Sequence, residues 1–192
     1  MERRKDWKEN QAEMDVSRLV FLDEAGVNLG MTRLYGWGEK SARVDDYVPD
    51  VRFERTSIVA TLRLSGINAP ICYRGTMNGE FFRAYIAQAL APTLRPGDIV
   101  VMDNLSSHKV DGALNPIYAR GARVLFLPPY SPDLNPIELA WSKIKSILRR
   151  QKARTHEDLR TALCAAMEAV TAADIRHWFT HDGYFLMQKA SM

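Results

Sequence analysis

Short apolar runs in the first half of the chain predict β-strands. Apolar and β-branched residues dominate 18–23, 27–37 and 56–66, and turn-forming or charged residues bound each run, which is the pattern of strands. The turns between these strands are short, so we expect antiparallel pairing. A brief apolar segment at 71–74 is a candidate for one more strand. The first run is apolar until it stops at an acid, Asp23.

In the second half, apolar runs alternate with stretches of helical periodicity. The runs 98–103 and 122–128 predict two more strands, and the first of them also ends in an acid, Asp103. Strand–helix alternation implies parallel strands. We therefore predict an α/β fold with a mixed five-stranded sheet, three antiparallel strands and then two parallel ones, flanked by helices. The stretches with helical spacing are 78–94, 110–121, 135–151, 155–170 and 173–185.

Length and composition indicate one globular domain. The 192 residues are enough for a sizeable core, and 46% hydrophobic with 26% charged residues is an ordinary globular composition. It excludes collagen-like, disordered and disulfide-scaffold chains. We expect a polar helical lead-in over 1–16, whose apolar residues are too sparse for a core of their own. The domain itself would follow over 17–182, with a C-terminal tail over 183–192.

Cysteine usage and the lack of long apolar stretches predict a cytoplasmic protein. Cys72 and Cys164 lie far apart among apolar residues, so we predict two reduced core residues rather than a disulfide or a metal site. Residues 1–15 are charged and lack the apolar centre of a signal peptide. No apolar run approaches the length of a membrane span, so we expect no membrane partner.

The net charge of +3 is small, but the cations are unevenly distributed. No acid occurs between Glu138 and Glu157. Such a run is either a solvated helix face or a binding site for a polyanion. The cations in this interval are Lys143, Lys145, Arg149, Arg150, Lys152 and Arg154.

Two apolar strands that both end in an aspartate suggest a ligand site. Strand ends of this kind face the ligand crevice in parallel α/β sheets, although an aspartate there is often only a helix cap or a turn former. If the two strands are neighbours, Asp23 and Asp103 lie close together and their charges repel. A divalent cation would relieve this repulsion, and oxygen-only ligands suit Mg²⁺ or Mn²⁺.

A proline-rich stretch, LPPYSPDLNPIELAWSKIK at 127–145, leads into a helix whose first turn carries one acid, Glu138. The prolines restrict the loop, while Asn135 and Pro136 suit the N-cap and first helical positions. The spacing predicts a buried stripe of Ile137, Trp141, Ile144 and Leu148. The adjacent stripe joins the acid to polar and basic residues, namely Glu138, Ser142, Lys145 and Arg149.

Three segments resemble the signature blocks of DDE transposases of the mariner superfamily, in its bacterial insertion-sequence branch. They are FLDEAG, VMDNLSSHK and the proline-rich stretch above. MTRLYGWGEK is similar to that family's second-strand segment. The 34 residues between Asp103 and Glu138 match the spacing of this branch, and the resemblance runs from about residue 16 to 180.

The resemblance implies a ribonuclease-H-like fold and a two-metal reaction on DNA. In that family a triad, here Asp23, Asp103 and Glu138, holds two Mg²⁺ ions, for which Mn²⁺ can substitute. Paired ions lie about 3.5–4 Å apart, which requires a bridging carboxylate. We assign the bridge to Asp23, on the central strand, with the other two acids each completing one ion. The implied reaction is DNA cleavage and strand transfer at transposon ends.

Residues beside these acids are candidates for auxiliary roles. Glu24 follows Asp23 and so points to the opposite face of a strand, which favours a structural or supporting role. Asn104 and His108 follow Asp103; the histidine is either structural or a contact to the scissile phosphate or metal-bound water. A serine-hydrolase site in this segment is disfavoured, because the G-x-S-x-G motif is missing and adjacent residues cannot form a nucleophile–base pair.

Basic and polar residues near the blocks are candidates for contacts to DNA phosphates, which position DNA without reading its sequence. Arg33 and Trp37 are weaker candidates, and a core position for Trp37 is an equal alternative. The main set is Lys109, Ser142, Lys145, Arg149 and Arg150, with Lys143 beside them.

The resembling family normally carries helix-turn-helix domains ahead of the catalytic one, and residues 1–16 cannot build one. We therefore expect a catalytic fragment, a truncated remnant, or a chain that works with a separate upstream helix-turn-helix polypeptide. The active form implied is a homodimer on DNA, associated with the nucleoid. Two alternatives stay open: a ribonuclease-H-like nuclease or resolvase of other specificity, and an inactive remnant that only binds DNA or dimerises.

Overall fold

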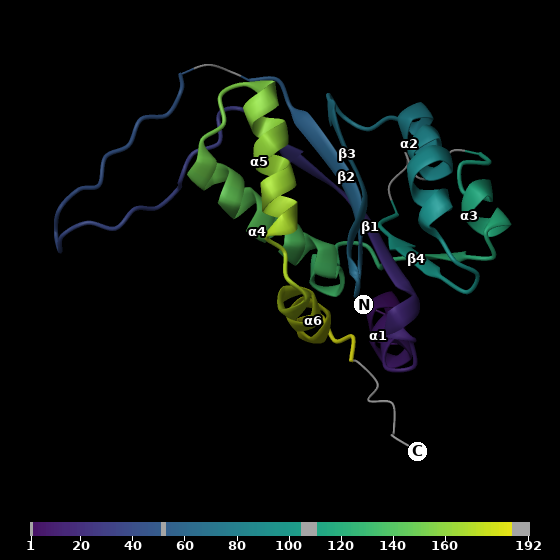
Figure 1. Ribbon diagram of the computed structural model, residues 1–192. Helices are drawn as coiled ribbons and strands as arrows, with labels where there is room; N and C mark the ends of the chain where they lie inside the picture. The colour runs from purple at the N-terminus through teal and green to yellow at the C-terminus, as the bar shows by residue number, and fades with distance from the viewer. Residues whose placement is uncertain (1, 51–52, 105–110, 186–192) are drawn as a thin grey trace.

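A mixed five-stranded sheet forms the centre of the molecule (Figure 1). The computed structural model describes residues 2–50, 53–104 and 111–185. Its strands are β1 (Leu19–Val27), β2 (Thr56–Arg63), β3 (Gly66–Arg74), β4 (Ile99–Met102) and β5 (Arg123–Phe126). They lie in the order β3-β2-β1-β4-β5, with antiparallel pairing among β1, β2 and β3 and parallel pairing of β4 with β1 and β5. The predicted fold class is confirmed.

The antiparallel half of the sheet uses different residues from those predicted. β1 does not stop at Asp23 but continues to Val27, because its second half pairs with β2 as far as Val27↔Thr56. No strand begins within 28–37, all of which the structure describes; this segment enters a long loop that projects from the sheet (Figure 1). The third strand is instead β3, which contains the weak segment at 71–74. Its side chains are only partly buried, so its apolar pattern is faint.

Helices cover both faces of the sheet (Figure 1). α2 (Gly79–Tyr85) and α3 (Asn115–Ala119) pack on one face, and α4 (Pro136–Gln151), α5 (His156–Glu168) and α6 (Ala172–His181) pack on the other. The helix predicted over 78–94 is α-helical only to Tyr85; π and 3-10 turns follow up to Thr93. Within the described ranges, no helix has both the length and the apolar composition needed to cross a membrane.

The residues of β1 alternate between these two helical layers, as strand geometry requires. Phe21 and Ala25 belong to the core beneath α4, whereas Leu22 belongs to the core beneath α2. Asp23 therefore faces α4. Glu24 faces the opposite side, as the sequence predicted.

The predicted buried stripe of α4 is confirmed. The helix begins with Pro136 in its first turn and ends where Lys152 adopts a left-handed conformation with φ of 51°. Asn135 occupies the N-cap position, but its side chain makes no capping hydrogen bond, so that part of the prediction is wrong. The buried residues of the stripe are Ile137, Trp141, Ile144 and Leu148.

Three residues that the sequence placed in the core, or allowed there, are exposed. Cys72 on β3 and Cys164 on α5 are free thiols at exposed positions, so their prediction as core residues is wrong. Leu163, directly before Cys164, is buried; apolar neighbours in sequence therefore did not identify the inward-facing position. Trp37 is fully exposed in the projecting loop, which excludes the core alternative for this residue.

Buried hydrogen bonds anchor the end of the proline-rich loop to the core of the molecule. Tyr184 is fully buried, and its hydroxyl donates to the Leu134 carbonyl at 2.8 Å. The same hydroxyl accepts from the indole N–H of Trp7, on α1 (Glu2–Gln11), at 3.3 Å. The residue just before Asn135 is thus tied to segments from both ends of the described chain.

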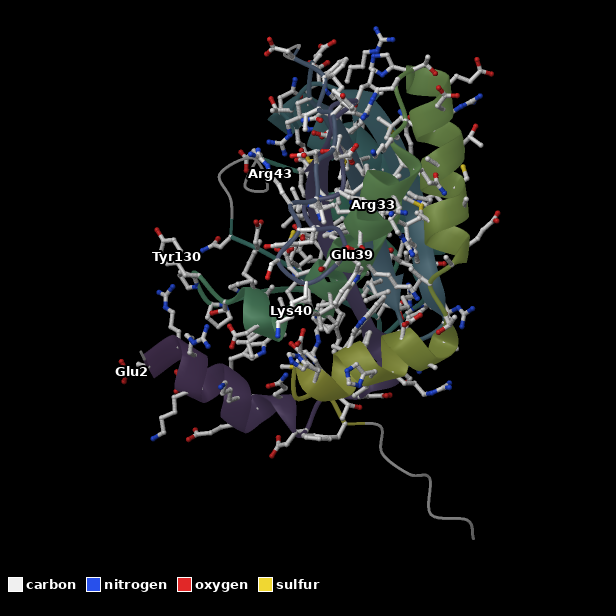
Figure 2. All side chains as sticks on the ribbon, turned by 90° about the vertical axis from the view of Figure 1, so that its left-hand side faces the viewer. Glu2, Arg33, Glu39, Lys40, Arg43 and Tyr130 are labelled. Atoms are coloured by element: carbon white, nitrogen blue, oxygen red, sulfur yellow. The ribbon has the colours of Figure 1, made fainter. Side chains whose placement is uncertain are left out.

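A surface contact holds the same loop from α1. The guanidinium of Arg4 donates to both carboxylate oxygens of Asp133, at 2.9 and 2.7 Å. It also donates to the hydroxyl of Ser131 at 2.8 Å. Figure 2 shows Tyr130, at the tip of the loop, on the same side of the molecule as the α1 end marked by Glu2. The loop that leads into α4 is therefore supported along its length.

Candidate active site

Strand register brings Asp23 and Asp103 to the same level of the sheet. β1 and β4 pair in parallel up to Phe21↔Val101, and each aspartate follows two residues later. Because side chains alternate along a strand, both aspartates lie on the face that carries Phe21 and Val101, beneath α4. β1 and β4 are neighbours in the sheet, so the condition under which the two aspartates were expected to lie close together is met.

Glu138 reaches the same place from α4. It lies in the first turn, and its backbone N–H donates to the Asn135 carbonyl at 2.9 Å. Asp23, Asp103 and Glu138 together line a cavity of about 420 Å³. Asn104 and the proline-rich loop form the rest of its wall. The structure therefore gathers the three predicted acids around one cavity.

The pKa of Asp23 is strongly raised. Burial is the main cause, and the charges of Glu138 and then Asp103 add to it; together they raise the pKa of Asp23 to about 7. The Glu24 N–H and the Trp141 indole oppose the rise by donating hydrogen bonds to the carboxylate, at 2.8 and 3.2 Å. Burial and the neighbouring acids thus disfavour the ionised form of Asp23 in this cavity.

Trp141 is a site residue that the sequence analysis missed. We assigned it to the buried stripe of α4, which is correct, but its indole N–H also donates to Oδ2 of Asp23. One signal was present: Trp141 lies three residues after Glu138, and residues at this spacing are neighbours on a helix surface. A buried indole also needs an acceptor.

The chemistry of the donors fits a divalent cation. Carboxylate oxygens are the preferred ligands of Mg²⁺ and Mn²⁺. The negative charges of Glu138 and Asp103 contribute to the raised pKa of Asp23. Among the residues that the structure describes, no three His, Cys, Asp or Glu side chains lie close enough to hold an ion as they stand. The acids come from three separate elements, so coordination requires their side chains to move inward.

The auxiliary candidates separate into three cases. Glu24 accepts from the Ser57 hydroxyl at 2.7 Å and from Arg55 at 3.3 Å, on the face away from the cavity. Asn104 is exposed and lines the cavity beside Asp103. His108 and Lys109 lie outside the described residues.

Two of the predicted DNA-contacting residues face a second cavity. Lys145 and Arg149 on α4 line a space of about 510 Å³ together with Arg55, which precedes β2. The end of β1, from Gly26 onward, forms another wall. β1 and α4 also contribute Asp23 and Glu138 to the acidic cavity. The same two elements therefore line both the acidic and the basic cavity.

The remaining DNA-contact candidates on α4 have different surroundings. Ser142 and Arg150 are exposed. Lys143 donates to Asp174 on α6 at 2.5 Å, and this pairing, with bonds from Thr171, lowers the pKa of Asp174 to about 2. Lys143 is therefore engaged in holding α4 to α6.

Comparison with known proteins identifies relatives of this arrangement. A family model described as "DDE superfamily endonuclease" matches residues 18–160. A search of curated proteins by sequence finds no match.

Solved structures of similar fold include those of Mos1 transposase. The chain matches the crystal structure of the mariner Mos1 paired-end complex with Mg with a TM-score of 0.77 at 19% identity, covering 94% of this chain and 59% of that one. It matches the catalytic domain of Mos1 mariner transposase with a TM-score of 0.70 at 18% identity, covering 94% and 86%. The chain thus spans less than two thirds of the transposase chain in the paired-end complex, and at this identity the likeness establishes the ribonuclease-H-like fold.

Proposed function

The chain belongs to the DDE superfamily endonuclease family, and on this premise we propose that it is the catalytic domain of a transposase. It would cleave DNA at transposon ends and join those ends to target DNA with divalent metal ions. One observation carries the proposal: Asp23, Asp103 and Glu138, from two neighbouring strands and one helix, line a single cavity. The raised pKa of Asp23, caused in part by the other two acids, supports their acting as one unit.

The three acids would hold two Mg²⁺ ions, or Mn²⁺ in their place. Bound there, the ions supply a lowered pKa for the attacking water or 3′-hydroxyl and stabilisation of the leaving oxygen. Asp23, on the central strand, is the residue we assign to both ions, with Asp103 and Glu138 each completing one. Trp141 and the Glu24 N–H hold the carboxylate of Asp23 in orientation.

Loss of one acid tests the proposal. We expect wild-type protein to nick supercoiled plasmid with Mg²⁺ or Mn²⁺, and Asp103→Ala to lose this activity by about 10³-fold or more, because a two-ion site fails without a ligand. Asp111→Ala, which removes an exposed aspartate, is the matched control and should nick normally. Equal nicking by wild type and Asp103→Ala would reject the assignment, and cleavage of RNA–DNA hybrids in place of plasmid would indicate a nuclease of other specificity.

DNA would approach along α4. Lys145 and Arg149, with Arg55 beside them, offer positive charge farther along the helix that carries Glu138, and phosphate contacts of this kind position a strand. Ser142 and Arg150 lie exposed on the same helix and are proposed to add to the contact.

Salt dependence of DNA binding checks this path. Replacing Lys145 and Arg149 together by alanine should weaken binding to any duplex and flatten the plot of log affinity against log salt by about 2, one per lost phosphate contact. Arg120→Ala, an exposed cation on the other helical layer, should leave the slope unchanged. An unchanged slope in the double variant would mean that DNA takes another path.

The finer placement of the chain is also a proposal. We assign it to the bacterial insertion-sequence branch of the mariner superfamily because the interval between Asp103 and Glu138 and the proline-rich block fit that branch. We further propose that it acts as a homodimer and that a separate helix-turn-helix polypeptide supplies recognition of the transposon ends. Asn104 and His108 are proposed to contact the scissile phosphate region.

A further inference from the structure

Asn135 is a buried polar residue whose side-chain oxygen has no hydrogen-bond partner among the described residues. Only 4% of its surface is exposed, and within the described part of the chain its Oδ1 is buried without a hydrogen-bond donor. Asn78, Thr155 and Thr171 hold the equivalent N-cap position of other helices, and each accepts a bond from its own helix. Asn135 makes no such bond. A buried acceptor without a donor lowers stability, so we expect its hydrogen-bond donor to come from outside the described residues.

The position of Asn135 limits which chemical groups can donate a hydrogen bond to its side chain. The residue lines the same cavity as Asp23, Asp103 and Glu138. Its backbone is fixed on both sides: its N–H donates to the Pro132 carbonyl at 3.1 Å, and its carbonyl accepts from the Glu138 N–H at 2.9 Å. The side chain is therefore held at the cavity wall rather than placed there by a mobile loop.

An amide oxygen can bind a metal cation or accept a hydrogen bond, as a carboxylate oxygen can. Unlike a carboxylate, it adds no negative charge to the cavity. Divalent Mg²⁺ and Mn²⁺ take carboxylate oxygens, amide oxygens and water as ligands. We propose that Asn135 is a positioning residue whose Oδ1 accepts from the water around a divalent ion held by the three acids. Residues that act on a metal through its outer contacts contribute to its affinity. This inference rests on the metal-binding function proposed above.

Two replacements of similar size separate this role from simple packing. Asn135→Leu fills the space but removes the acceptor, whereas Asn135→Asp retains an acceptor oxygen. A residue that only fills space should tolerate leucine and suffer from the buried charge of aspartate. A residue that accepts from the hydrated ion should show the opposite order.

The test is a calorimetric titration of the full chain with Mn²⁺ alone, without DNA. We expect Asn135→Leu to bind Mn²⁺ about tenfold more weakly than wild type, and Asn135→Asp to bind as tightly or more tightly. Without metal, Asn135→Leu should melt at or above the wild-type temperature, because an unpaired buried oxygen is gone. Thr56→Val removes a buried hydroxyl outside the cavity that has no hydrogen-bond partner among the described residues. It should likewise melt no lower and should leave Mn²⁺ affinity unchanged.

Different outcomes overturn different conclusions. If wild type binds Mn²⁺ and both Asn135→Leu and Asn135→Ala bind it equally well, the role of Asn135 is rejected while the metal site stands. Weaker binding by Asn135→Asp with normal binding by Asn135→Leu also rejects it, in favour of packing. If wild type itself binds no Mn²⁺, the proposed metal function fails and this inference fails with it. Asn135→Ala covers the case in which leucine prevents folding.

Discussion

Replacing Asp23 by asparagine is expected to abolish DNA cleavage and, at the same time, to stabilise the metal-free protein at neutral and higher pH. The carboxylate lines the proposed metal cavity together with Asp103 and Glu138, so its loss should lower metal-dependent nicking by roughly 10³-fold or more. The stabilisation has a separate cause. Burial and two neighbouring acids raise the pKa of Asp23 to about 7, which means that folding disfavours its ionised form.

The pH dependence follows from the sign of this shift. Because the folded pKa lies above the ordinary value of 3.8, the protonated acid contributes stability that is fully present below about pH 4 and is lost as pH rises through 7. At pH 8 the asparagine variant should therefore exceed wild type in free energy of unfolding by roughly 2–4 kcal/mol. At pH 4 this advantage should vanish.

Urea unfolding of both proteins from pH 4 to 8, in the presence of a chelator, measures this difference. Mn²⁺ should stabilise wild type alone and so reverse this difference, because the ion needs the ionised carboxylate. Its binding should become tighter as pH rises through 7. Asp111→Asn is the matched control, because it changes an exposed aspartate and should follow wild type throughout. Equal pH profiles for wild type and Asp23→Asn would contradict the crowding of charge at this site.

The second large effect concerns Trp141, which joins the core to the site. Its ring is buried on the core side of α4, and its indole N–H donates to Asp23 at 3.2 Å. Trp141→Ala should destabilise the protein by about 3–5 kcal/mol, because a large cavity opens in the core. Trp141→Phe should retain most of the packing but leave the carboxylate without this donor. The pKa of Asp23 should then rise further, and Mn²⁺ affinity at pH 7 should fall by about 10–100-fold.

Trp178→Phe provides the comparison for Trp141→Phe. Trp178 is another buried tryptophan of the same core, on α6, so both variants lose similar ring area. We expect only Trp141→Phe to move the midpoint of Mn²⁺ binding to higher pH. If both variants lose stability equally and neither moves that midpoint, Trp141 serves the core alone.

The parts of the fold that the sequence predicted well are those in which periodicity and burial agree. The buried stripe of α4 was predicted because its residues recur at helical spacing and all face the core. β4 was predicted from a short apolar run, and the structure buries all four of its residues. Glu138 was placed beside the aspartates by the resemblance to the transposase family, and its position in the first turn followed from the helix start at Pro136.

The errors arise where tertiary contacts override local pattern. β1 continues beyond Asp23 because β2 supplies pairing partners that sequence alone does not show. β3 alternates between partly buried and exposed residues, so its signal was weaker than that of 27–37, which forms no strand of its own. Trp141 was placed correctly in the core, yet its bond to Asp23 depends on the distance between a helix and a sheet. Local periodicity carries no information about that distance.

The hydrogen bond from Tyr184 to the Leu134 carbonyl also orders events during synthesis. A growing chain acquires Asp23, Asp103 and Glu138 well before Tyr184 is added. Until then the proline-rich loop lacks its buried anchor at Leu134. Because domains fold as units while the ribosome extends them, the acids are made first and their braced arrangement last. A nascent chain would thus hold every proposed catalytic residue before it holds the assembled site.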